Sequence, residues 1–271
     1  MEDVRVTRTT GAAALLCMLL TSAVCADAVS PTGTVKLKYL RVSPRKVVTI
    51  SYPGGQETGY AGRYNLQLDP TYDPDGGFPG TGEGEAVYAA SESDDYKLET
   101  FCADLYDNPA ASYQIYEVYL PEDLPVGPGQ IPLGDKKAAE LRKLFFNKEG
   151  LVGGSADLAA AFNACVWEIV YENSGPYDIE MGEGDLYVVY GGATPGWVNT
   201  ANDWLSDLSG YKDPDIGVRV LVNAGLQDFA MSVSIVGAST DSIPEPLTML
   251  GVFAGVAGVG TYIRRRRAGT R

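Results

Sequence analysis

Few residues of this chain could do chemistry, and their types exclude several mechanisms. The 271-residue sequence contains four cysteines and no histidine. Without histidine, neither a Ser-His-Asp nor a Cys-His nucleophile can be assembled, and the commonest zinc ligand is missing. Cys17 and Cys25 lie close to the N-terminus, which leaves Cys102 and Cys165 as the candidate thiols of the main body.

Closely spaced carboxylates are the second set of candidates. They occur in loop-like stretches at Asp73 and Asp75, Glu83 and Glu85, Glu183 and Asp185, and Asp213 and Asp215. Calcium prefers such oxygen ligands, but none of these stretches has the full EF-hand spacing. A glycosidase also needs two carboxylates, and nothing in the sequence defines their separation. We expect no enzyme activity and no cofactor, with a sugar-active enzyme and a calcium site as the respective alternatives.

The overall charge excludes one class of partner. The formal net charge is −14, and the basic cluster near the C-terminus makes the rest of the chain still more acidic. Such a surface repels phosphate groups. We therefore expect no nucleic-acid partner.

The N-terminus has the pattern of a secretory signal peptide over residues 1–26. Arg5 and Arg8 precede the apolar run from Gly11 to Leu20, and small residues follow it. Cleavage after Ala26 or after Ala28 by signal peptidase would remove Cys17 and Cys25. A lipoprotein modified at Cys25 is the alternative, but valine at position 24 suits it poorly. The pattern predicts export across the inner membrane.

The C-terminus predicts a membrane segment. Residues 247–263 are uncharged and apolar, and as a helix they would be roughly 25 Å long. A basic cluster follows at once, formed by Arg264, Arg265, Arg266 and Arg267. The positive-inside rule keeps this cluster cytoplasmic and places the acidic body outside. We expect a transmembrane helix that anchors the exported chain before it is processed.

Residues 242–271 as a whole resemble the PEP-CTERM sorting signal of Gram-negative bacteria. The resemblance is carried by Pro244-Glu245-Pro246, the apolar span and the terminal arginines, whereas Ile243 replaces the usual valine. It implies recognition by an exosortase, a membrane cysteine protease or transpeptidase of exopolysaccharide-producing species. The processed protein would then be found at the cell surface or in the extracellular matrix, with exopolysaccharide as a further partner.

Between these ends, the pattern predicts one α+β domain over residues 30–240. Period-two alternation predicts strands at 34–40, 46–52, 60–68, 97–107, 112–120, 216–225 and 228–237. Helical periodicity predicts helices at 135–147, 155–173 and 197–208, and glycine-rich residues 71–88 are expected to form a loop. We expect a mostly antiparallel sheet or barrel with two or three inserted helices.

The body resembles bacterial surface thioester domains. The resemblance is carried by Phe101-Cys102-Ala103-Asp104, by Asn163-Ala164-Cys165-Val166-Trp167 and by Gln227-Asp228, and it covers about residues 47 to 230. In active members of this family, a cysteine and a glutamine condense to an internal thioester that couples the protein to surface nucleophiles. Here Asn163, one methylene shorter, stands where the second motif has its glutamine. The resemblance therefore implies a chemically silent domain with vestigial positions at Cys102 and Asn163; the alternative is a covalent adhesin with an active thioester.

A disulfide is the structural alternative for the two thiols. Cys102 and Cys165 are the cysteines that remain after signal cleavage, and an exported protein meets an oxidising compartment. If residues 156–171 are helical, Cys165 shares a stripe with Phe162 and Ile169, whereas Asn163 lies roughly 200° away around the axis. We therefore predict a Cys102–Cys165 disulfide and no thioester.

Overall fold

The computed structural model describes residues 30–72, 81–91, 95–126, 131–173, 175–212, 214 and 216–234, and at 81–85 only the backbone is described. The strands are β1 (Gly33–Tyr52), β2 (Gly55–Leu68), β3 (Thr81–Gly82), β4 (Lys97–Cys102), β5 (Gln114–Tyr119), β6 (Pro125–Val126), β7 (Ile131–Pro132), β8 (Tyr187–Val189), β9 (Ile216–Asn223) and β10 (Leu226–Ser234). The helices are α1 (Glu83–Ala90), α2 (Asp135–Val152), α3 (Ala156–Tyr171) and α4 (Gly196–Ser206), with short 3₁₀ turns η2 (Pro121–Asp123) and η3 (Leu208–Gly210).

The main sheet is antiparallel and closes on itself. Its strands run in the order β2-β4-β10-β9-β5-β1, and β1 also pairs with β2. The long strand β1 makes this closure, because it pairs with β2 along one edge and with β5 and β8 at different points of the other edge. Its pairing with β2 shifts register between Tyr39 and Arg41 and between Val42 and Arg45. Such irregularities bend a strand, so two strands that were predicted separately are one curved strand.

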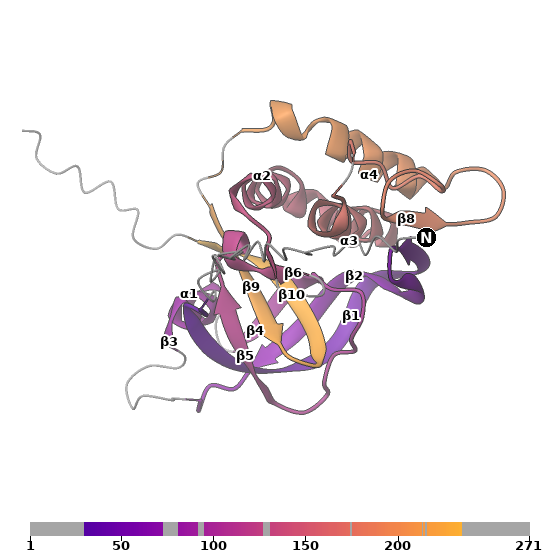
Figure 1. Ribbon diagram of the computed structural model, residues 1–271. Helices are drawn as coiled ribbons and strands as arrows, with labels where there is room; N and C mark the ends of the chain where they lie inside the picture. Colours follow the sequence, from indigo (N-terminus) through magenta and orange to yellow (C-terminus); the bar gives the residue numbers. More distant parts are fainter. Residues whose placement is uncertain are drawn as a thin grey trace, which may run out of the picture.

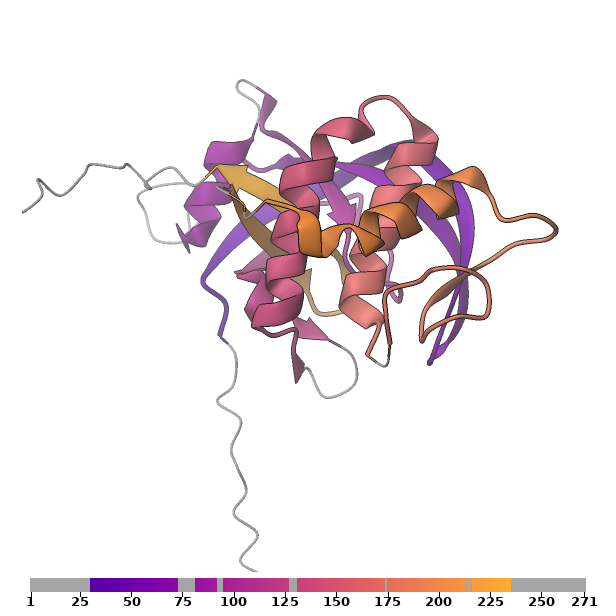
Figure 2. The same ribbon diagram turned by 90° about the horizontal axis from the view of Figure 1, so that it is seen from above.

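Three helices lie together over one side of the closed sheet (Figures 1 and 2). Helix α3 is the central one and packs against β1, β2 and β4 as well as against α2 and α4. It begins at an N-cap, Ser155, whose hydroxyl oxygen accepts a hydrogen bond from the backbone N–H of Leu158 at 3.3 Å. Every residue from Ala159 to Tyr171 is buried. A helix that is buried on all sides has no polar face to show which way it is turned.

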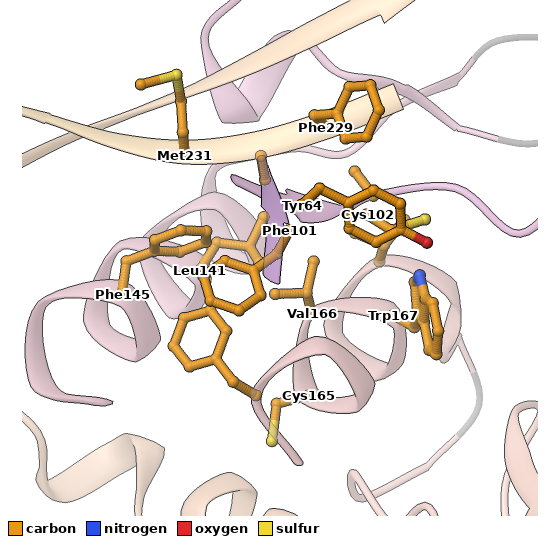
Figure 3. Close-up of a cluster of buried hydrophobic side chains, with 14 of the residues drawn as sticks. Tyr64, Phe101, Cys102, Leu141, Phe145, Cys165, Val166, Trp167, Phe229 and Met231 are labelled. Atoms are coloured by element: carbon orange, nitrogen blue, oxygen red, sulfur yellow. The ribbon is translucent and has the colours of Figure 1, made fainter. Parts of the chain in front are cut away.

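The core lies both inside the closed sheet and between the sheet and the helices. Inside, the Phe229 ring packs on Tyr64 and Tyr116 with centroid separations of 5.5 and 6.0 Å. On the helix side, the Phe162 ring packs on Phe101 and Phe145 at 4.2 and 5.0 Å. Figure 3 shows this second cluster between the strands and helices α2 and α3. Strand β4 therefore ends between two tightly packed aromatic groups.

The predicted fold class, a mixed α+β domain with a mostly antiparallel sheet, is confirmed. The structure adds a fourth helix, α1, which begins in the glycine-rich stretch 71–88 that was predicted as a loop and ends two residues after it. Val87 and Tyr88 of this helix are buried, and the Tyr88 hydroxyl donates to the carbonyl of Asp69 at 2.8 Å. Tertiary packing thus orders a helix that the local composition does not favour.

The two predicted terminal signals lie outside the described residues. They are the signal peptide at 1–26 and the sorting region at 242–271, including its apolar span and arginine cluster. Among the helices that are described, none is long and apolar enough to cross a membrane.

Candidate functional site

The end of strand β4 places the Cys102 thiol against the side chain of Gln227. The sulfur is buried, and the Gln227 amide nitrogen lies 2.7 Å from it. The thiol also contacts the carbonyl oxygen of Asp104 at 2.6 Å. Gln227 is 7% exposed and reaches the sulfur from β10, which pairs with β4 through Phe229 and Cys102. A thiol and a carboxamide from distant parts of the chain are therefore in direct contact.

A β-bulge brings Gln227 to this position. Leu226 pairs with Asn223 of β9 and Phe229 pairs with Leu221, so Gln227 and Asp228 together oppose a single residue. Such a bulge breaks the regular alternation and re-aims the side chains that it contains. The carboxylate of Asp104 then holds the bulge, because it accepts a hydrogen bond from the backbone N–H of Asp228 at 2.5 Å.

Asp104 also shapes the chain that follows Cys102. Its other oxygen accepts the backbone N–H groups of Tyr106 and Asp107 at 2.9 and 3.1 Å. One carboxylate thus ties the turn after the thiol to the backbone beside Gln227. The motif Phe101-Cys102-Ala103-Asp104 contains this residue, but its sequence alone did not indicate this role.

Asn163 of α3 is inserted between strands β2 and β4. Its side-chain oxygen accepts the backbone N–H groups of Gly62 and Cys102, each at 3.3 Å, and its nitrogen donates to the carbonyl of Cys102 at 3.0 Å. The last β2–β4 pair is Arg63 with Phe101, so the two strands part where this amide enters. Asn163 is fully buried, and its amide group bonds backbone, not the thiol.

The predicted Cys102–Cys165 disulfide is wrong. Both thiols are free and buried, and Cys165 contacts the carbonyl of Ala201 in α4 at 3.5 Å. Figure 3 shows the two cysteines on opposite sides of α3. Asn163, and not Cys165, lies on the face of α3 that meets Cys102. Because α3 is buried all round, its apolar stripe did not identify the face that meets the sheet.

A pocket of about 390 Å³ is lined by Gln227 and Asp104, whereas Cys102 lies buried behind them and is not among its lining residues. Its aromatic lining consists of Tyr39, Tyr60, Tyr64, Tyr106 and Trp167, and its acidic lining of Glu57, Asp104 and Asp107. Figure 3 shows the Tyr64 hydroxyl and the Trp167 indole nitrogen on the side of the Cys102 sulfur. Within the described residues, the Gln227 side-chain oxygen has no hydrogen-bond partner. The Trp167 indole N–H makes no well-aligned hydrogen bond, but it lies close enough to the Cys102 sulfur to oppose the rise in the pKa of that thiol. An unpaired acceptor and an indole N–H beside the sulfur therefore belong to residues that line the same pocket.

Burial controls the protonation of this site. It raises the pKa of the Cys102 thiol well above its ordinary value, and the negative charge of Asp104 acts in the same direction. Burial likewise raises the pKa of Asp104, and burial together with the neighbouring Asp104 raises the pKa of Asp228 to about 8. At neutral pH the sulfur is therefore a protonated thiol in a site that disfavours anions.

The acidic pairs do not form a metal centre in the described part of the chain. No group of three or more potential ligands there could hold a metal ion. Of the predicted pairs, only Glu183 and Asp185 have described side chains. One oxygen of Asp185 accepts the backbone N–H of Asn173 at 3.3 Å, so this carboxylate stabilises the chain after α3.

We predict that Asn163→Ala lowers the free energy of unfolding by at least about 2 kcal/mol, measured by urea unfolding. The substitution leaves three buried backbone groups of Gly62 and Cys102 without their partner, and each such group costs about 1–3 kcal/mol. Asn199→Ala, at an exposed position of α4, is the matched control and should change the value by less than about 0.5 kcal/mol. Equal losses in the two variants would contradict the role assigned to Asn163.

We also predict that Asp228→Asn makes stability less dependent on pH. Folding raises the pKa of Asp228 from 3.8 to about 8, so the native state holds a proton that the unfolded chain releases. Unfolding free energy should therefore fall as pH rises through this interval. The variant should exceed wild type at pH 8 by at least about 1.4 kcal/mol, the equivalent of one pKa unit. The difference should shrink toward pH 4; a constant difference at all pH values would contradict this interpretation.

Comparisons with known proteins found one distant likeness. No protein-family model matches the chain, and no curated protein matches it. Among solved structures, an N-terminal thioester domain of a surface protein from Clostridium perfringens is similar, with a TM-score of 0.34 and 10% sequence identity. The match covers 62% of this chain and 86% of that chain. At this identity and TM-score, the likeness carries no argument about function.

Proposed function

We propose that this chain is an exported surface protein whose body forms an internal thioester between Cys102 and Gln227 and couples covalently to amines. The observation that carries the proposal is the 2.7 Å separation between the Cys102 sulfur and the Gln227 amide nitrogen. A thiol held in contact with a carboxamide provides the proximity that acyl transfer requires, once the thiol proton is given up to the leaving nitrogen. The contact joins β4 and β10, whose pairing holds it in place.

The proposed step balances without a further reactant. The sulfur attacks the side-chain carbonyl carbon of Gln227, a carbon–sulfur bond forms, and the carbon–nitrogen bond breaks. The thiol proton leaves with the nitrogen as ammonia. In the second step, a primary amine attacks the same carbon, an amide forms, and the amine proton passes to the Cys102 sulfur. Each domain therefore reacts once, which fits a covalent adhesin and not an enzyme that turns over.

The surroundings of Cys102 and Gln227 would protect a thioester from hydrolysis until a target amine binds. Cys102 is buried and Gln227 nearly so, and exclusion of water protects a thioester from hydrolysis. The Trp167 indole N–H lies beside the Cys102 sulfur and makes no well-aligned hydrogen bond in this state. We assign it the role of donor to the oxygen that becomes negative when the carbonyl is attacked.

A chemically silent domain was expected because residue 163 is asparagine and not glutamine. In the structure, however, the amide beside the sulfur belongs to Gln227, while Asn163 bonds backbone. The asparagine at position 163 is therefore compatible with an active thioester at Gln227. Three residues of the body therefore have separate roles in the proposal. Cys102 supplies the sulfur, Gln227 supplies the acyl group, and Asn163 positions the end of β4.

Export and sorting complete the proposal and are supported by sequence alone. The signal peptide at 1–26 would direct the chain across the inner membrane, and Pro244-Glu245-Pro246 would present it to an exosortase. Residues 247–263 and the arginines that follow would anchor the precursor with its C-terminus in the cytoplasm. The processed protein would then act at the cell surface or in the matrix, where exopolysaccharide surrounds it.

Intact mass of the exported protein tests the proposal. We expect a mass about 17 Da below that of the processed chain, the loss of one ammonia, and its disappearance on treatment with methylamine. Cys102→Ser and Gln227→Ala should abolish the deficit. Cys165→Ser, which removes the other buried thiol, should keep it. The same spectrum reports cleavage after residue 26 or 28 and near residues 244–246.

A wild-type mass without the deficit, together with two titratable thiols after unfolding, would contradict the proposal of a thioester. Retention of residues 1–26 or 247–271 in the exported form would refute the sorting part alone. The two halves of the proposal are therefore tested separately by one measurement.

A further inference from the structure

We infer that the target of the proposed thioester is an extended, lysine-bearing polypeptide segment that adds as a strand to the free edge of β2. The inference rests on the proposed function and concerns how the target is recognised. Asn163 separates β2 from β4. Beyond this point, β2 continues to Gly55 and, among the described strands, pairs with β1 alone.

The backbone of this segment points into the split. The N–H of Gly62 bonds Asn163 on the side away from β1, and the carbonyl of Tyr60 accepts the Tyr64 hydroxyl at 2.9 Å. Alternate residues of a strand direct their N–H and C=O groups to the same edge. Thr58 and Gln56 continue this series, and within the described residues no hydrogen bond is found on their outer edge. An unprotected edge is a template for another strand.

The same edge forms one wall of the pocket beside Gln227. Residues 57–60 line it on one side, and residues 104–109 line it on the other. All of residues 55–60 are exposed, including Tyr60 at 40%. A strand added here would run past the Cys102–Gln227 contact with every second side chain turned toward it.

The charges of the pocket favour a basic segment. Glu57, Asp104 and Asp107 are among its lining residues, and none of the described lining residues is a lysine or arginine. The nearby Arg45 guanidinium is stacked on the Tyr60 ring at 3.8 Å from its centroid. The aromatic rings other than Tyr60, such as Tyr39 and Trp167, add faces that attract an ammonium group. These features fit a lysine side chain better than the hydroxyl groups of a neutral polysaccharide. They also match a protein with a formal net charge of −14.

Two acetylated synthetic hexapeptides of alternating threonine and lysine test the inference. One has a normal backbone, and the other carries N-methyl groups at alternate residues, which block strand pairing but leave the amines intact. We expect the normal peptide to couple to wild-type protein at least about tenfold faster, because the methylated one cannot make the backbone hydrogen bonds. Methylamine coupling serves as the measure of thioester reactivity.

A protein variant provides the reciprocal test. Thr58→Pro removes one outward N–H and should slow coupling of the normal peptide by at least about tenfold. The peptide rate is divided by the methylamine rate of the same variant, so that a general loss of thioester reactivity or folding does not count as a loss of recognition, and this ratio should fall by at least about tenfold. Glu57, whose backbone faces β1, is left unchanged so that the ladder with β1 stays intact.

Binding without chemistry separates this inference from the proposed function. In Cys102→Ser, which cannot form a thioester, the fluorescently labelled normal peptide should still bind, and the methylated one should bind at least about tenfold more weakly. Equal coupling and binding of the two peptides would overturn the inference even if the thioester forms. Displacement of the peptide by dextran, a polysaccharide without amines, would overturn it as well.

Discussion

The site depends on one buried asparagine that enters the gap between two strands. Asn163 satisfies the N–H groups of Gly62 and Cys102 and the carbonyl of Cys102, three groups that a continuing β2–β4 ladder would have paired. Buried backbone groups must be satisfied somewhere, so the sheet can open here only because this amide replaces the ladder. Asparagine has both a donor and acceptors at its tip, which alanine or leucine at the same position would lack.

Because the sheet opens at Asn163 while Cys102 stays buried, the thiol can meet a side chain from another strand without being exposed to solvent. The thiol stays in a dry environment that keeps it protonated, and Gln227 reaches it through the bulge that Asp104 holds. The outer edge of β2, freed by the same separation, borders the pocket through which a target would approach. One packing interaction of α3 thus accounts for the end of the ladder, the position of the thiol and the open strand edge.

Much of the fold follows from the sequence, and the reasons for the failures are physical. Alternating residues predicted β5, β9 and β10, and helical periodicity predicted α2, α3 and α4 within a few residues. The bend in β1 was missed because register irregularities have no period-two signal, and α1 was missed because glycine-rich composition masks a helix ordered by tertiary contacts. The orientation of α3 was wrong because residues that are buried on all sides do not distinguish one face from another.

The residues of the site could also be predicted only in part from the sequence. Cys102 was identified as the candidate thiol, and Gln227-Asp228 was identified as part of the resemblance. The vestigial partner of the thiol was assigned to residue 163, whose amide bonds backbone in the structure. The sequence separation of 125 residues between Cys102 and Gln227 hides their contact, which depends on the pairing of β4 with β10. The glutamine in a Leu-Gln-Asp-Phe bulge was the one available signal, and it has meaning only once the register of β10 is known.

The most direct measurement is the location of the amine adduct. Protein treated with isotopically labelled methylamine, digested and sequenced by tandem mass spectrometry, should carry the label on the side chain of residue 227 and a free thiol at Cys102. Label on residue 163 would contradict the central claim that Cys102 and Gln227 form the reactive pair. The absence of label from both side chains after prolonged treatment would contradict it as well.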